Sequence, residues 1–253
     1  MSFRIVAAQG KCIKKRKAEE GVQITLPSKD YVFSQDSIVS SVMLDRESYL
    51  IHPATSKFVN NNGDAWSNEC LQTNYKSFIG AFNYVNHVQE QDKAVGFIAD
   101  AVLRRRILNT EKNIFIYYVD ILVATHRDNE TLVGKILNGS IKQLSMGCDA
   151  NTSQCSKCGE IFTDDNDICD HLYTDKGKYY VDGDGNRRIV AELLGNHEEG
   201  SVVFTEASWL TKVPAFHGAI TRNILKIPEG ANIEVTIPKF AMEREAIKQF
   251  VQI

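Results

Sequence analysis

The nonapeptide at residues 139–147 (GSIKQLSMG) contains the hydroxyl whose surroundings best suit nucleophilic chemistry. Ser145 stands here between an apolar residue and a flexible glycine, Gly147. Most serines in such a setting are ordinary turn or strand-end residues, because a serine reacts only when a base and an oxyanion site accompany it. Ser145 is therefore a candidate nucleophile whose partners must come from elsewhere in the chain.

A general base for this serine would be a neutral imidazole within hydrogen-bond reach, so each of the six histidines is a candidate. His87 ends an apolar run and precedes a polar turn, which makes it the best candidate. His126 follows the apolar run 114–124 and remains the alternative. The other histidines are assigned to a metal site (His171) or to surface positions (His52, His197 and His217).

The third catalytic member would be an acid that orients the imidazole, and Glu206 lies inside the apolar run 202–210 (VVFTEASWL). Burying a carboxylate among such neighbours is costly unless it is paired, so we expect Glu206 to have a partner. That partner is either the catalytic histidine or backbone amides near Pro214. Both interpretations remain open at this point.

A cluster of cysteines immediately after the nonapeptide indicates a metal site. Cys155 and Cys158 form a CxxC pair, and Cys169 and His171 follow after an acidic loop. Three thiolates and one imidazole suit a tetrahedral zinc ion, and four protein ligands leave no position for water, as in a structural site. Free thiols or transient disulfides are the alternative interpretation.

Cys148 lies close to both predicted sites without a clear place in either one. It is a possible replacement metal ligand, but it stands seven residues before Cys155 and lacks a CxxC partner. It is also a second candidate nucleophile, in which case thiol reagents would abolish activity and Ser145→Ala would not. As a small apolar residue it is better explained as part of the core.

The composition is that of an ordinary soluble globular protein. The chain has 253 residues, of which 43% are hydrophobic and 24% charged, with a formal net charge of −3. This balance argues against bulk electrostatic binding to nucleic acid or to anionic membranes, and the short basic run 14–17 is expected to be a solvated loop. The chain has no apolar run of about 18 residues, and its N-terminal pattern is the reverse of a signal peptide, so we expect neither a membrane span nor export.

Apolar, β-branched and aromatic runs predict the elements that would position these residues. Strands are expected where such runs occur, at 3–8, 22–26, 78–88, 95–103, 114–124, 141–146, 202–210 and 233–237. A hairpin is expected at 179–194, with its turn at 182–186, and a long functional loop at 45–74. Helices are expected after Asp128 or Asn129, from Pro214 through Leu225, and at 240–251.

Together these elements predict an α+β fold. Its core would be β-rich, largely antiparallel and barrel-like, with short flanking helices and an inserted zinc-ribbon loop. The runs 78–88, 95–103 and 114–124 are expected to be neighbours in one sheet. We expect a single domain over 1–253, with the zinc-binding loop inserted at 148–175.

Three ordered blocks resemble the tailed-bacteriophage prohead (capsid maturation) serine proteases, whose fold is similar to that of the herpesvirus assemblins. The blocks are NYVNHVQEQDKAVGFIADAVL with His87, VGKILNGSIKQLSMGC with Ser145, and FTEASWLTKVPAF with Glu206. They anchor about residues 80–225. The zinc ribbon between the second and third blocks departs from the simplest members and looks like a large-phage variant.

The resemblance implies a serine endopeptidase that processes capsid and scaffold proteins inside the procapsid, in the host cytoplasm. His87, Ser145 and Glu206 would be its triad, although relatives use either His or an acidic residue at the third position. Backbone amides near Met146 and Gly147 would be the oxyanion donors. The resemblance also implies a possible homodimer, and possible self-cleavage after glutamates near the C-terminus, at Glu243 or Glu245.

Two other classes of function remain as rivals. A non-enzymatic virion or scaffold protein would retain the fold and the zinc loop without hydrolysis, but it has no reason to retain histidine, serine and glutamate together. A zinc-dependent nucleic-acid adaptor would want Lys and Arg where the loop between the cysteines carries Asp164, Asp165 and Asp167. We therefore expect no nucleic-acid partner.

Overall fold

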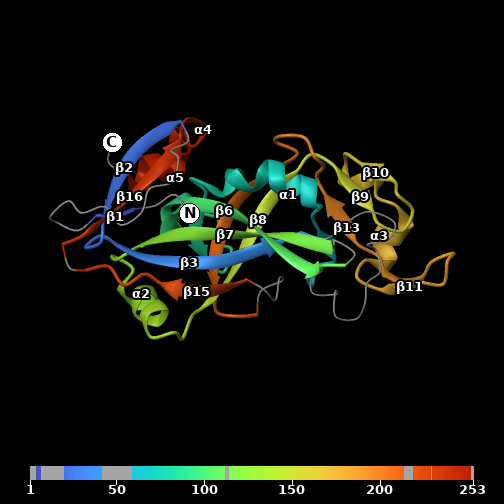
Figure 1. Ribbon diagram of the computed structural model, residues 1–253, viewed down its shortest axis with the longest axis horizontal. Coiled ribbons are helices and arrows are strands. Elements are labelled where there is room, and N and C mark those ends of the chain that lie inside the picture. The colour runs from blue at the N-terminus through green and yellow to red at the C-terminus, as the bar shows by residue number, and fades with distance from the viewer. Residues whose placement is uncertain are drawn as a thin grey trace.

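A closed β-barrel forms the centre of the computed structural model (Figure 1), which describes residues 4–6, 20–41, 59–111, 114–213, 219–228 and 230–251. The α+β class predicted from the sequence is confirmed, as is the barrel-like core with short helices. Neighbouring strands close the barrel in this order: β14 (Val202–Leu210), β5 (Phe82–Val85), β6 (Gly96–Asn109), β7 (Ile114–His126), β3 (Tyr31–Ser40), β15 (Ile220–Ile224) and β8 (Gln143–Ala150).

The predicted neighbours β5, β6 and β7 are confirmed as consecutive antiparallel strands. Aromatic and β-branched side chains in these runs suit a pleated surface that is buried on at least one face. The predicted run 78–88 is shorter as a strand than expected, because its first residues lie in the 3-10 helix η1 (Tyr75–Phe78) and a turn at Gly80. A second 3-10 turn, η2 (Gln91–Lys93), connects β5 to β6.

Helix α2 (Glu130–Leu137) and strand β8 carry the chain to Ser145 as the sequence predicts. Gly139 has φ of +74°, which suits the glycine expected to end the helix. Strand β8 continues four residues beyond the predicted end at Met146, so Ser145 lies inside the strand. Strand β14 pairs antiparallel with β8 and parallel with β5, and it thereby joins the segments that contain Ser145 and His87.

Two predictions about irregular and helical segments are wrong. The helix expected from Pro214 through Leu225 is a strand, β15, which completes the barrel between β3 and β8; residues 214–218 lie outside the described residues. Closure of the barrel satisfies the backbone of this segment, and that tertiary gain outweighs its local helical pattern. The predicted loop at 45–74 contains strand β4 (Asp64–Ala65) and helix α1 (Asn68–Asn74), while residues 45–58 lie outside the described part.

A second sheet covers one end of the barrel near both chain termini. Its order is β1 (Arg4–Val6), β16 (Asn232–Pro238) and β2 (Gly21–Pro27). The helix expected at 240–251 is divided into α4 (Lys239–Met242) and α5 (Glu245–Phe250). The main core is continuous from this end through the barrel to α1, and Phe78 stacks on Phe204 there with ring centroids 4.1 Å apart.

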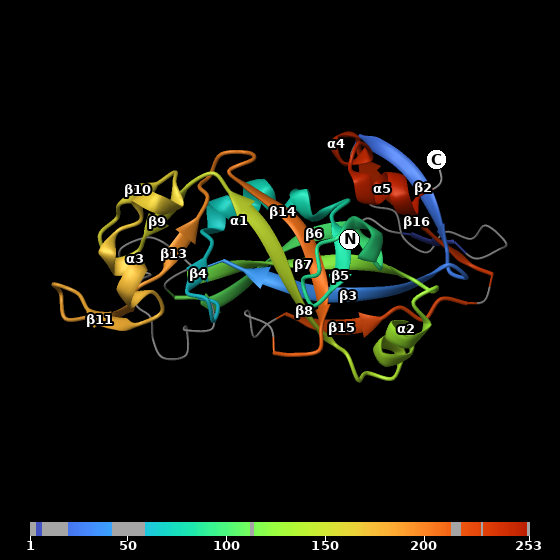
Figure 2. The same cartoon turned by 180° about the vertical axis from the view of Figure 1, so that it is seen from behind.

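A third sheet lies at the opposite end of the molecule (Figures 1 and 2), and its strand β9 contains Cys155. Its order is β10 (Ile161–Phe162), β9 (Ser153–Cys155), β13 (Glu192–Leu194) and β4. The 3-10 turn η3 (Asp165–Asp167) and helix α3 (Asp170–Asp175) follow β10. The hairpin predicted at 179–194 is confirmed for β11 (Tyr179–Val181) with β12 (Arg187–Ile189), but residues 192–194 belong to β13, which pairs with β9 and β4 instead. We call residues 151–195 the metal lobe; the domain limits expected from the sequence stay a prediction.

Among the described residues, the structure has no helix with the length and apolar character needed to cross a membrane.

Candidate functional site

The loop after β5 presents His87 in an unusual backbone conformation. Asn86 and His87 have φ of +53° and +59°, a left-handed region that non-glycine residues adopt rarely and at a cost. Contacts with the end of β14 hold this turn in place. The Asn86 N–H donates to the Trp209 carbonyl at 2.9 Å, and the Asn86 side-chain oxygen accepts from the Thr211 N–H at 3.0 Å.

His87 and Glu206 form a short polar contact in the site. Nδ1 of His87 lies 2.6 Å from Oε1 of Glu206, a carboxylate that is only 1% exposed. The second carboxylate oxygen, Oε2, accepts a hydrogen bond from the Ser208 hydroxyl at 2.6 Å. The expectation that a buried Glu206 has a partner is confirmed, and the histidine is that partner.

The electrostatic consequence of this contact falls on the imidazole. The hydrogen bond to Glu206 raises the pKa of His87; burial opposes this shift, and the carboxylate charge adds to it. With Nδ1 as the donor to the carboxylate, the other ring nitrogen, Nε2, can accept a proton when the imidazole is neutral. The arrangement therefore suits a general base.

Ser145 lies on the same face of the sheet as the acid. Strands β14 and β8 place Ser208 opposite Ser145 and Glu206 opposite Gly147. Side chains of directly opposed residues in an antiparallel pair project from one face, with Cβ atoms about 5 Å apart. The absence of a side chain at Gly147 is required here, since a Cβ atom would lie 2.9 Å from Oε1 of Glu206.

A cavity of about 700 Å³ brings the three predicted residues together, because His87, Ser145 and Glu206 all line it. The His87 side chain is 39% exposed, so its ring is accessible from this cavity. His126, the alternative base, lies instead against the Tyr31 ring, with centroids 5.2 Å apart, and 3.3 Å from the Asp128 carboxylate. Among the described residues, His87 lines this cavity and His126 does not.

The predicted oxyanion donors lie on a strand that is paired mainly on one side. Within the described residues, β8 pairs with β14 along its length but with β15 only at Gln143. Backbone N–H groups alternate between the two edges of a strand, so part of those at 145–147 face away from β14. Met146 and Gly147 are neighbours, so only one of their two N–H groups can face away from β14 and donate to an oxyanion in the cavity.

A buried polar chain that the sequence analysis missed lies beneath the site. The Asn83 amide donates to the Ala207 carbonyl at 2.7 Å, and its oxygen accepts from the Thr125 hydroxyl at 3.2 Å. The Trp209 indole N–H donates to the same hydroxyl at 3.1 Å. Asn83 and Thr125 are polar residues next to or within apolar runs, and this was the signal that could have predicted the chain, because buried polar groups are normally hydrogen-bonded.

Cys148 also lines the cavity, one residue after Gly147. Burial, followed by the charges of Asp64 and Asp149, raises the pKa of its thiol to about 12. The thiolate is the reactive form of cysteine, so this environment disfavours Cys148 as a nucleophile. Its partly buried side chain packs against the main core, as expected.

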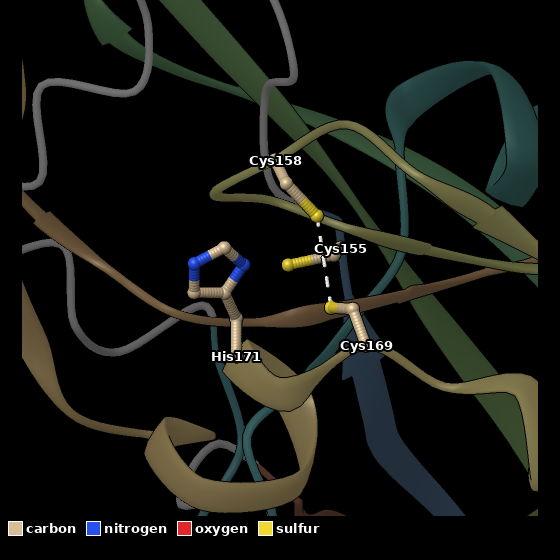
Figure 3. A group of neighbouring side chains, drawn as sticks. All are labelled: Cys155, Cys158, Cys169 and His171. Atoms are coloured by element: carbon tan, nitrogen blue, oxygen red, sulfur yellow. Dashed lines mark hydrogen bonds between the residues drawn. The ribbon is translucent and has the colours of Figure 1, made fainter.

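The four predicted metal ligands converge in the metal lobe (Figure 3). One ligand atom from each of Cys155, Cys158, Cys169 and His171 lies within 4.8 Å of the others. The Cys158 and Cys169 sulfurs are 3.6 Å apart. Tetrahedral zinc with Zn–S bonds of about 2.3 Å would separate two sulfurs by about 3.8 Å, so the spacing fits a metal ion.

The histidine of this cluster supplies a second test of the fit. Nδ1 of His171 is buried and has no hydrogen-bond partner among the described residues. In Figure 3 a ring nitrogen of His171 faces the Cys155 sulfur. A buried nitrogen without a partner is costly unless something binds it, and a metal ion would do so. The cluster can therefore hold a metal, while Cys148 lies outside it.

Local structure explains how so short a segment assembles these ligands. Gly159, with φ of +78°, turns the chain so that its N–H donates to the Cys155 carbonyl at 2.8 Å. Cys169 and His171 stand at the start of α3. A small core of Phe162, Leu172 and Val190 packs against the buried Cys155. Ligands on β9 and on α3 are thus held together by a turn and a few apolar contacts.

Comparisons with family models, curated proteins and solved structures find no match to this chain.

Proposed function

We propose that the chain is a serine endopeptidase in which Ser145 is the nucleophile, His87 the general base and Glu206 the residue that orients the imidazole. The observation that carries this proposal is the 2.6 Å contact between Nδ1 of His87 and a buried Glu206 carboxylate, at a cavity that Ser145 also lines. Nucleophile, base and orienting acid at one cavity are the parts that acyl transfer requires.

The chemistry follows from these positions. The Ser145 hydroxyl attacks the carbonyl carbon of the scissile peptide bond while Nε2 of His87 accepts its proton. The tetrahedral intermediate collapses when the imidazolium returns that proton to the leaving amine, which leaves an acyl ester on Ser145. Water then attacks this ester with His87 again as base, and releases the acid and free Ser145.

Glu206 acts by holding the imidazole and by stabilising its positive charge. The raised pKa of His87 expresses that stabilisation of the imidazolium, which forms each time the serine is deprotonated. Ser208 keeps the carboxylate oriented through Oε2, and its oxygen also accepts from the His87 backbone N–H at 3.2 Å. Both bonds favour one rotamer of the acid.

For the biological setting we propose maturation of a tailed-phage head. Three sequence blocks that contain His87, Ser145 and Glu206 resemble the prohead proteases. The substrates would be phage capsid and scaffold proteins inside the procapsid, within the host cytoplasm. A homodimer and self-cleavage near Glu243 or Glu245 belong to the same proposal.

We also propose that the metal is zinc in a structural role. Three thiolates and one imidazole form a ligand set that zinc prefers. Four protein ligands would leave no position for water or substrate, so the ion would hold the lobe together. Metal analysis of the purified protein should find one zinc per chain.

The test of the enzymatic proposal is the reaction of Ser145 with a fluorophosphonate probe, together with co-expression of the candidate capsid and scaffold proteins. Ser145→Ala should abolish both labelling and processing, and His87→Ala should reduce both by several orders of magnitude. His126→Ala is the matched control and should behave as wild type. Processing that survives Ser145→Ala would refute the assignment of Ser145 as the nucleophile. If Cys148→Ala abolishes processing while Ser145→Ala does not, the nucleophile is the Cys148 thiol.

Processing that is absent from the wild-type protein as well would favour the non-enzymatic virion component.

A further inference from the structure

One row of residues connects the metal cluster to the wall of the catalytic cavity. In the sheet of the metal lobe, Glu192 on β13 stands directly opposite Cys155 on β9 and also opposite Asp64 on β4. Cys155 is a member of the metal cluster, and Asp64 lines the cavity that contains Ser145. A metal ligand and a cavity residue are therefore separated by a single strand.

Lys176 forms ion pairs with two residues of this row, Asp64 and Glu192. Its ammonium lies 2.6 Å from the Asp64 carboxylate and 2.5 Å from the Glu192 carboxylate. These three side chains are only 17–26% exposed, so solvent screens the pairs less than at an open surface. Burial opposes the charge of Lys176, but the two carboxylates raise its pKa overall.

The wall segment packs closely against the same lysine. A Cβ atom at Gly63 would lie 2.6 Å from Cγ of Lys176, and Gly63 has φ of +79°. The Asn60 side-chain oxygen accepts from the backbone N–H of Asp64 at 2.8 Å, which closes a tight loop. Asn60, Asn62 and Asp64 all line the catalytic cavity. Movement of Lys176 would therefore displace this part of the cavity.

The metal would control the position of Lys176 from both sides. Cys169 and His171 begin helix α3, and Lys176 directly follows its last residue. The N–H of Gly177 donates to the Val190 carbonyl at 2.7 Å, near the start of β13. A metal bound by residues of α3 and β9 would thus fix α3, which precedes Lys176, and β13, which lies next to β9.

The proposed catalytic residues lie outside this lobe. Ser145 and Glu206 lie on barrel strands, and the turn with His87 is bound to the end of β14. Loss of the lobe's order would therefore change the far wall of the cavity and leave the Ser145, His87 and Glu206 arrangement in place.

We propose that the metal lobe positions the substrate-binding wall, with Lys176 as the positioning residue that transmits metal occupancy to residues 60–64. This inference rests on the proposed peptidase function, since it assigns those residues to the binding of the substrate peptide. Metal loading then sets the affinity for peptide, whereas the intrinsic reactivity of Ser145 is set by the barrel.

The experiment compares Lys176→Ala, Lys176→Arg and Lys178→Ala with the wild-type holoprotein and with protein treated with a chelator. Lys178 is the matched control, because it is 67% exposed and its ion pair is with Asp175 inside the same lobe. Five quantities are measured: bound zinc, the fluorophosphonate labelling rate, kcat, KM for a peptide substrate, and hydrogen–deuterium exchange of residues 59–66.

Lys176→Ala should bind one zinc per chain and label normally. Its KM should rise about tenfold, because Asp64 and Glu192 lose their shared cation and the cavity wall at residues 60–64 is no longer held in place. Exchange in residues 59–66 should accelerate at least about tenfold, as expected when a local structural unit loosens. Lys176→Arg should restore most of both effects, and Lys178→Ala should match wild type. Chelation should reproduce the changes in KM and exchange.

Unchanged exchange and KM in both Lys176→Ala and the chelated protein would overturn the inference. A fall in labelling equal to the fall in kcat/KM would also overturn it, since the lobe would then support the catalytic residues themselves. Failure of wild-type protein to label or cleave would refute the proposed function and the substrate role. Faster exchange in residues 59–66 would still show, in that case, that the lobe holds the wall.

Discussion

Replacement of Glu206 by glutamine tests the proposed triad most directly, because the change removes one charge and keeps the shape. In the wild type, Oε1 lies 2.6 Å from Nδ1 of His87 and Oε2 accepts from Ser208. Both carboxylate oxygens accept hydrogen bonds, whereas the glutamine amide has one oxygen that accepts and one NH₂ group that donates. The contact that meets the NH₂ group must therefore reverse its direction. If the NH₂ group turns to His87, the imidazole is forced into the tautomer that carries its proton on Nε2.

The size of the effect can be estimated from the ion pair. Two unit charges 2.6 Å apart attract by about 6 kcal/mol at an effective dielectric constant of about 20. The His87 side chain is 39% exposed, so solvent screening reduces this to about 3 kcal/mol, or roughly 100-fold in rate. The wrong tautomer adds to this loss, and together they predict a fall in kcat between about 100-fold and about 10⁴-fold.

The pH dependence supplies a second readout. His87 must be neutral to accept the serine proton, and Glu206 raises its pKa, so we expect wild-type activity to be lost as the pH falls through that raised value. In Glu206→Gln the pKa of His87 should fall and the acidic limb of the kcat/KM profile should move to lower pH. A pH series of peptide cleavage measures both effects, and thermal unfolding confirms that the variant is folded.

A matched control is Glu90→Gln, which removes a charge from a side chain that is 58% exposed and paired with Lys93. It should leave the rate and the acidic limb unchanged. Glu206→Gln protein with a wild-type rate, or with an acidic limb at the same pH, would show that the acid does not act on His87 during the reaction.

Three further outcomes are expected. Gly147→Ala should lower kcat at least about tenfold, since the new Cβ atom displaces the carboxylate next to it. Peptide cleavage measures this loss, and thermal unfolding shows that the variant is folded. Cys155→Ser should release the metal, measured by metal analysis, and lower the temperature of the first unfolding transition in calorimetry. An unchanged metal content would contradict the four-ligand site. Burial raises the pKa of Asp36 to about 7, so the folded state holds a proton there that the unfolded state releases, and stability declines as pH rises from about 4 to 7. Asp36→Asn should therefore stabilise the protein at pH 8 by on the order of 1 kcal/mol and much less at pH 5, measured by urea unfolding; equal changes at both pH values would contradict this.

The metal cluster was the part of the site most open to prediction from sequence. Its four ligands lie within 17 consecutive positions, from Cys155 to His171, and their residue types have few other uses at that spacing. A ligand set that is local in sequence needs only a turn and a short helix to converge, so the prediction did not depend on the rest of the fold.

The pairing of His87 with Glu206 was harder to predict, because 119 positions separate the two residues. The buried acid indicated that a partner exists, but either His87 or backbone amides could have satisfied it. The parallel register of β14 with β5, which brings the end of β5 beside Trp209, decided between them. Ser208 and the left-handed turn at Asn86 left no mark in the pattern of apolar residues.

Strands β3 and β15 show why the strands that close the barrel could not be predicted. Strand β3 is buried on both faces and includes buried polar residues such as Asp36, so it lacks a simple alternation. Strand β15 carries a local pattern that suits a helix, and it becomes a strand because β3 and β8 offer edges on either side. Such long-range pairing outweighs local propensity, and no single segment encodes it.

The sequence by itself determined the classes of chemistry available: a serine in a glycine-bounded strand, a histidine after an apolar run, an acid in an apolar strand and a set of candidate metal ligands. It also determined the α+β class, through the periodicity of its apolar residues. Tertiary structure alone decided which histidine meets the acid and that Asp64, on the strand next to β13, lines the same cavity as Ser145. The physical reason is that side-chain type and local spacing act within a segment, whereas strand register and burial depend on segments that meet only in the folded chain.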